Sequence, residues 1–201
     1  ATISATYLWN NGDTTNIISG LAAGSYWCTV SDQNNCSSTT DTIIITEPTA
    51  ITVSSSTTNV SCNGGNDGTA TVNVSGGTPG YTYLWSPGGQ TTATATNLTA
   101  GTYTCTVTDA NGCPYSGNPI SVTITEPAAA LTIGGTDSTI IVCNGDSTGT
   151  ATVINVSGGT PGVGGYTYSW NTNPIQTTPT ATGLSAGLYT VTVSDSISCS
   201  T

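Results

Sequence analysis

Polar and apolar residues alternate one by one along several short segments of the chain. Thr69–Val74 reads T-A-T-V-N-V, and Thr102–Val107 reads T-Y-T-C-T-V. Alternation with a period of two, rich in β-branched and aromatic residues, is typical of half-buried β-strands. No segment keeps a helical spacing, and no window of about 18 apolar residues occurs. The pattern therefore predicts an all-β chain.

Three groups of residues recur in the same order along the sequence. A tryptophan ends an aromatic strand, a tyrosine follows a Leu-x-x-Gly-x motif, and an aspartate precedes a cysteine by four positions. The members are Trp9, Tyr26, Asp32 and Cys36; Trp85, Tyr103, Asp109 and Cys113; and Trp170, Tyr189, Asp195 and Cys199. The spacing is about 77 residues, then 86. A fixed order at such a period indicates tandem modules.

Two further repeated motifs indicate where the modules begin and end. Cys62-Asn63-Gly64 and Cys143-Asn144-Gly145 mark a first turn, and Glu47-Pro48 and Glu126-Pro127 mark a module's end. We therefore expect a partial module over 1–49 (a C-terminal half), a complete module over 50–127, and a module over 128–201 that lacks its last strand. Because both outer modules are incomplete in this division, we expect the sequence to be part of a longer array.

Within the complete module the alternating segments are separated by Gly, Pro and Asn clusters. The expected strands are 51–60, 68–75, 81–85, 91–97, 102–108 and 119–125, with a short seventh near 113–116. Short strands in about 78 residues around one tryptophan are typical of an immunoglobulin-like β-sandwich. Tyr103, two residues before Cys105, resembles the tyrosine corner of that fold. The predicted architecture is an elongated array of small sandwich modules.

The charges exclude several functions. The chain has ten Asp or Glu and no Lys, Arg or His, for a net charge of −10, and only 5% of its residues are charged. Without cations it cannot neutralise nucleic-acid phosphates. Without His or Lys, most nucleophile–base pairs and common zinc sites lack their parts. We expect no enzyme activity, no nucleic-acid partner and no catalytic or metal residues.

Three motifs resemble those of a known family. They are Gly76-Gly77-Thr78-Pro79 with Tyr81 to Trp85, then Leu98-Thr99-Ala100-Gly101-Thr102-Tyr103, then Asp109-Ala110-Asn111-Gly112-Cys113. Their order resembles the SprB repeat of very large Bacteroidota surface adhesins. The third module repeats it with insertions near Val163-Gly164-Gly165, and the first matches from Tyr7 to Pro48. The family also resembles PKD-type sandwiches.

The resemblance implies a stalk or adhesive array of a cell-surface adhesin, exported by type IX secretion and attached to the outer membrane. For gliding species it implies partners of three kinds: a substratum or surface polysaccharide, neighbouring repeats, and envelope gliding machinery outside this sequence. Two alternatives stay open. One is a carbohydrate-binding or spacer appendage of a secreted hydrolase, and the other is a surface filament subunit.

Seven cysteines in an exported chain need an explanation. Cys62 with Cys113, and Cys143 with Cys199, occupy matching positions in two modules, so we expect each pair to form a disulfide. In the chain-entropy account, such a bond would stabilise its module by about 4 kcal/mol. Cys36 would then pair with a cysteine upstream of residue 1.

Cys28 and Cys105 remain, and we interpret them as small buried hydrophobes. The main rival pairing is Cys62–Cys105. A metal site built from four cysteines is a weaker alternative, since the sequence has no C-x-x-C motif.

The remaining candidate sites follow from local motifs. We expect the repeated tryptophans and tyrosines, Trp9, Trp85, Trp170, Tyr26, Tyr103 and Tyr189, in the cores. Trp27, which has no aromatic counterpart in the other modules, should be exposed or at a module interface. Thr42 and Ser196 follow an aspartate and precede an aliphatic residue, which resembles the O-glycosylation acceptor of Bacteroidota.

No cofactor is expected. The turn carboxylates of Asp67 and Asp109 leave calcium as the alternative. Calcium takes about six to eight oxygens, whereas one carboxylate per turn is ordinary turn chemistry.

Overall fold

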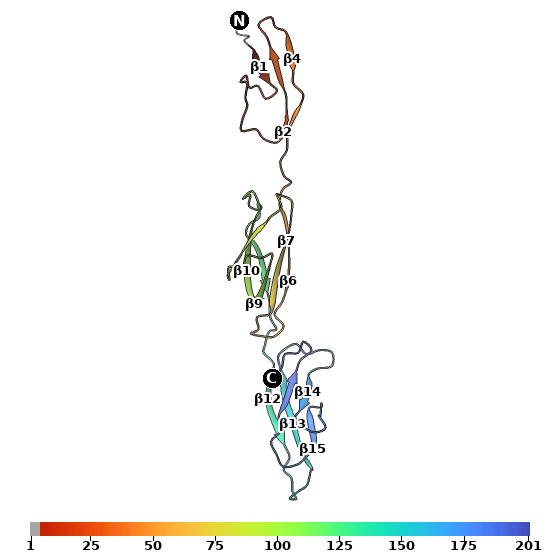
Figure 1. The fold of residues 1–201 in the computed structure, drawn as a ribbon. Helices are drawn as coiled ribbons and strands as arrows, with labels where there is room; N and C mark the ends of the chain where they lie inside the picture. Colours follow the sequence, from red (N-terminus) through yellow and green to blue (C-terminus); the bar gives the residue numbers. More distant parts are fainter. Residues whose placement is uncertain (1–4) are drawn as a thin grey trace. The chain divides into compact units, whose positions relative to one another are not determined.

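The computed structural model describes residues 5–201, and these residues contain β-strands and no helix (Figure 1). The chain divides into two compact units after Ala50. The first unit contains the strands β1 (Thr6–Trp9), β2 (Gly24–Tyr26), β3 (Cys28–Ser31), β4 (Ser37–Thr39) and β5 (Ile43–Ile45). The second unit holds two separate hydrophobic clusters, one in each of its two repeats.

The complete repeat consists of two antiparallel three-stranded sheets. One has the order β6-β7-β9 and the other the order β11-β10-β8. The strands are β6 (Thr52–Thr58), β7 (Gly68–Ser75), β8 (Thr82–Ser86), β9 (Thr94–Leu98), β10 (Gly101–Thr108) and β11 (Ile120–Ile124). Every expected strand lies within a few residues of its predicted position, except the seventh. Near 113–116 there is only an isolated bridge between Thr108 and Pro114. Proline lacks the N–H that a longer ladder needs.

The core lies between the two sheets because alternate residues of each strand point inward. On β7, Ala70 and Val72 are buried, and on β10 every second residue from Tyr103 to Val107 is buried. Trp85 is 1% exposed at the centre of the cluster. The period-two pattern of the sequence thus becomes one packed face per strand.

The third repeat has the sheets β12-β13-β15 and β14-β16. Its strands are β12 (Thr132–Ser138), β13 (Gly149–Ser157), β14 (Thr167–Trp170), β15 (Thr180–Leu184) and β16 (Val191–Ser194). Trp170 is 3% exposed in its core. β16 is half the length of β10, since no counterpart of β11 pairs with it in the described chain. A hollow of about 380 Å³, lined in part by Ile141, Gly149 and Leu184, marks this edge.

In the first unit the sheets are β1-β3-β4 and β2-β5. β2 and β3 together match β10, and β5 matches β11, since Gly24–Tyr26 pairs with Ile43–Ile45 as Gly101–Tyr103 pairs with Val122–Ile124. The fold is all-β throughout residues 5–201, as small tandem β-sandwich modules. None of these residues forms a helix long and apolar enough to cross a membrane.

Candidate functional site

After the strands that carry the repeated tyrosine, each repeat has a turn, here called the last turn, that an aspartate organises around its cysteine. In the complete repeat, Asp109 Oδ1 accepts hydrogen bonds from the backbone N–H groups of Asn111 and Cys113, both at 2.9 Å. The Asp109 N–H donates to the Cys113 carbonyl at 3.0 Å. The same pair of bonds joins Asp195 to Cys199 and Asp32 to Cys36. All three last-turn cysteines therefore have the same backbone setting.

The aspartate also ties this last turn to the Gly-Gly-Thr-Pro turn. Asp109 Oδ2 accepts from the Thr78 N–H at 2.9 Å, and Asp195 Oδ2 accepts from the Thr160 N–H at 2.7 Å. Both carboxylates are buried, and the backbone donors lower their pKa values, the Thr78 and Thr160 N–H groups contributing most. The anion is thus held by N–H groups, which explains an acidic residue at the end of a neutral strand.

The glycines of that turn are required by the same contact. Gly77 and Gly159 have φ of 62° and 61°, a left-handed conformation that favours glycine. A Cβ at Gly159 would lie 2.6 Å from Asp195 Oδ2, and one at Gly77 would lie 3.0 Å from Asp109 Oδ2. Any side chain there would push against the buried carboxylate.

The first turn of the complete repeat lies at the other end of the sandwich and is clamped by two acidic residues. Asp67 accepts hydrogen bonds from the Ser61 hydroxyl and N–H, which lower the pKa of its carboxyl. Glu126 Oε2 accepts from the Gly64 N–H, and the Asn63 amide donates to the Pro127 carbonyl at 2.8 Å. Hydrogen bonds to Glu126 and Pro127 therefore hold the Cys62 turn in place. The sequence alone did not indicate this role for Glu126.

A disulfide joins the first turn of one repeat to the last turn of the next. Cys62 bonds to Cys199 with a Cα–Cα distance of 5.6 Å and a sequence separation of 137. The Cys199 sulfur also lies 3.5 Å from the Ser61 carbonyl oxygen. In the chain-entropy account, closing a loop of this length stabilises the folded chain by about 5 kcal/mol. The bond connects the second and third repeats covalently.

This finding corrects the pairing expected from the sequence. Cys62 does not pair with Cys113, nor Cys143 with Cys199; Cys113, Cys143 and Cys36 are free and exposed. In the complete repeat, Cys62 and Cys113 lie beyond opposite ends of β10, whose eight residues span about 25 Å. A disulfide needs Cα atoms within about 7 Å. The two cysteines of each expected pair occupy matching positions because the sequence repeats. They do not lie close together within one repeat.

The other two cysteines are buried thiols. Cys28 is 2% exposed and Cys105 is fully buried, and each thiol donates to the carbonyl of the next residue. Burial raises the pKa of the Cys105 thiol. Cys105 lies within the core cluster, which leaves the rival Cys62–Cys105 bridge unformed.

The repeated aromatic residues share one set of hydrogen bonds. The indole N–H of each tryptophan donates to a backbone carbonyl six to eight residues later: Trp9 to Thr15, Trp85 to Thr92, and Trp170 to Thr178. Each tyrosine hydroxyl donates to the carbonyl four residues upstream: Tyr26 to Ala22, Tyr103 to Thr99, and Tyr189 to Ser185. Trp85, Trp170 and Tyr103 are buried, whereas Trp9, Tyr26 and Tyr189 are half-buried.

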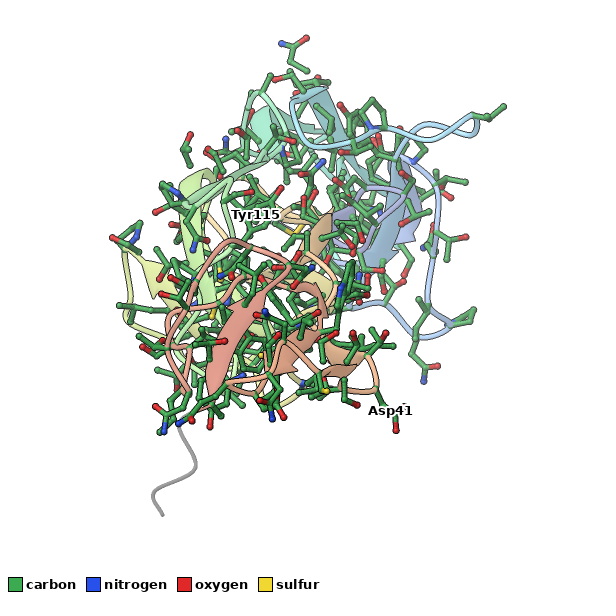
Figure 2. The ribbon with its side chains drawn as sticks, turned by 90° about the horizontal axis from the view of Figure 1, so that it is seen from above. Asp41 and Tyr115 are labelled. Carbon is green, nitrogen blue, oxygen red and sulfur yellow. A yellow bond between two sulfur atoms is a disulfide. The ribbon has the colours of Figure 1, made fainter. Side chains whose placement is uncertain are left out.

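The candidate modification residues lie on the surface. Thr42 is exposed beside Asp41, whose side chain points away from the ribbon in Figure 2. Ser196 is exposed, and its hydroxyl donates to the Thr160 carbonyl at 2.6 Å.

Trp27 lies between β2 and β3 and is 41% exposed. Tyr115, also labelled in Figure 2, packs against the core of the complete repeat.

The two turn carboxylates named for the calcium alternative, those of Asp67 and Asp109, lie in different turns. Asp67 and Asp109 both accept hydrogen bonds from their own turns, so those oxygens already have partners. No group of three or more Cys, Asp or Glu side chains with metal-site geometry occurs within residues 5–201. Two of the cysteine-bearing turns, those of Cys62 and Cys199, form a covalent link between repeats.

Two segments of the chain match a protein-family model. The SprB repeat model matches residues 54–90 and 135–174. Each match contains a Cys-Asn-Gly turn, a Gly-Gly-Thr-Pro turn and the aromatic strand that ends in Trp85 or Trp170. Neither match reaches residues 1–49, so the first copy is assigned by its repeated residues alone. A search of the curated proteins gave no match.

Proposed function

Because the chain carries an SprB-repeat region, we propose that it is a non-catalytic part of the stalk of a large cell-surface adhesin, exported by type IX secretion and moved by a gliding motor. The family is a non-catalytic repeat family of extracellular or cell-surface proteins. The stalk would reach a substratum or surface polysaccharide, with the chain attached at the outer membrane.

The observation that carries this proposal is the Cys62–Cys199 bond between successive repeats. A stalk transmits force, and a disulfide across the junction of two sandwiches carries the load past residues 63–198. The surface supports the same role. Its polar residues are mostly neutral, its net charge is −10, and a charge of one sign opposes self-association.

Burial of the repeated tryptophans argues against the carbohydrate-binding appendage. Trp85 and Trp170, at 1% and 3% exposure, cannot stack against a sugar ring, which needs an open aromatic face. Trp27 is the exposed tryptophan among the described residues, and it has no counterpart in the other two repeats.

The test is to label living source cells with a fluorescent antibody raised against residues 51–201 and to follow the label. Spots that travel along the cell and stop when the proton gradient is collapsed would support a gliding adhesin. Static surface label would contradict the motor and retain a passive adhesin. Label found only in the medium would overturn the surface role and favour a secreted-enzyme appendage.

A further inference from the structure

We propose that the Cys62–Cys199 bond is one rung of a staggered disulfide ladder. In this ladder, the first-turn cysteine of each repeat bonds to the last-turn cysteine of the next repeat. Cys143 and Cys113 are then half-sites for the neighbouring rungs. The inference rests on the repeat order and on export to an oxidising compartment, and does not depend on adhesion or gliding.

Cys143 occupies the same turn as the bonded Cys62. Both precede Asn-Gly, and the glycines, Gly64 and Gly145, have φ of 76° and 90°. In each turn the cysteine carbonyl accepts a hydrogen bond from the residue three positions later, at 2.8 Å for Cys62 and 3.3 Å for Cys143. Cys143 is free and exposed. It therefore presents the thiol that Cys62 presents, one repeat further along.

Cys113 occupies the same turn as the bonded Cys199. Its N–H donates to Asp109 Oδ1 at 2.9 Å, and the Cys199 N–H donates to Asp195 Oδ1 at the same distance. Cys113 is free and exposed, as is Cys36 in the equivalent turn of the first repeat. The Cys62–Cys199 bond shows that the cysteine of a last turn forms a disulfide when the first-turn cysteine of a neighbouring repeat lies next to it.

A disulfide partner of Cys113 or of Cys143 has to belong to another repeat. β10 separates Cys113 from its own first turn by about 25 Å, and the nine residues of β13 separate Cys143 from Cys199 by about 30 Å. Both distances far exceed the reach of a disulfide. Consecutive repeats bring opposite ends together, as Cys62 and Cys199 demonstrate.

Each rung forms by a balanced exchange. Two thiols give up two protons and two electrons and form one S–S bond. The electrons pass to the disulfide of a thiol–disulfide oxidoreductase, or of oxidised glutathione in vitro, which becomes two thiols. In an array of four such repeats, the bonds would connect repeat one to two, two to three and three to four, so the closed loops would overlap. Every stretch of backbone between the outermost rungs is then bridged by at least one bond.

The test uses this chain extended after Thr201 by a second copy of residues 116–201. This keeps the repeat phase, because Cys199-Ser200-Thr201 corresponds to Cys113-Pro114-Tyr115. After oxidation with a glutathione buffer, free thiols are alkylated and the unreduced chain is cut before aspartate. Such cleavage puts all seven cysteines of the original chain on different peptides. The first Cys199 peptide runs on into the added copy, so its mass differs from that of the last one.

We expect two linked pairs: Cys62 with the first Cys199, and Cys143 of the original chain with the added Cys199. Cys113, Cys36 and the added Cys143 should be alkylated. C143S in the original chain should abolish the second pair, and C143S in the added copy, the matched control, should leave it intact. In the control variant, which keeps Cys143 only in the original chain, an alkylated Cys143 would overturn the proposal. A Cys143–Cys199 pair that disappears only when the added copy carries C143S would also overturn it. Such a pair would join the added Cys143 to the added Cys199, which belong to the same repeat.

Discussion

The disulfide between repeats should reduce the length to which the chain extends under force. The size of the reduction follows from the positions of the two bonded cysteines. Under tension applied at the two ends, the load passes from Cys62 directly to Cys199, so residues 63–198 lie outside the load path. Those residues contain most of the core of the complete repeat and the whole core of the third. The separation of 137 residues, at about 3.6 Å per extended residue, corresponds to about 490 Å of hidden length. The folded distance that it replaces is 5.6 Å between Cα atoms.

The assay is single-molecule pulling in the absence and presence of a reductant. The oxidised chain should stop short of the reduced one by about 490 Å, and the C62S/C199S variant should behave as the reduced chain without any reductant. A C113S/C143S variant is the matched control and should keep the difference. An oxidised chain that extends as far as the reduced one would refute the load path through this bond.

Four further predictions test the fold beneath the site. Asp109→Asn should lower the melting temperature at pH 7, and this difference from wild type should shrink as the pH falls below about 4; the lowered pKa contributes stability above the unfolded value that is lost on protonation. Ile124→Ala, at a side chain 1% exposed, should cost about 2–5 kcal/mol in denaturant unfolding, against under about 1 kcal/mol for the exposed Thr123→Ala. Tyr103→Phe should cost about 1 kcal/mol through the lost bond to Thr99, measured in the same way. Adding residues 116–127 after Thr201 should raise the melting temperature of the third repeat by supplying a counterpart of β11, and the same extension with Ile124→Thr should raise it less.

Much of the fold followed from local chemistry. Alternation of Thr with Val, Ala and Tyr predicts strands because only one face of each strand meets the core. The repeated tryptophan and tyrosine lie where their strands place them, each with its hydroxyl or indole N–H on a nearby carbonyl. These contacts span six to eight residues for tryptophan and four for tyrosine, so a short stretch of sequence contains both partners.

The cysteine pairing depended on long-range geometry instead. Seven cysteines at repeated positions allow several pairings, and equal spacing within two repeats favoured the wrong one. The bonded partners are 137 residues apart and belong to opposite ends of different sandwiches. Glu126 likewise reaches Gly64 only because β11 returns the chain to the end where β6 leaves it.

From the sequence alone one can therefore derive an all-β chain of tandem modules without cationic chemistry, since composition and periodicity are properties of neighbouring residues. Only the tertiary structure decided that Asp109 and Asp195 hold their turns through buried carboxylates and that Cys62 bonds to Cys199. Those outcomes depend on which strand ends meet in space. That meeting is determined by the direction and length of each strand, which no local pattern specifies.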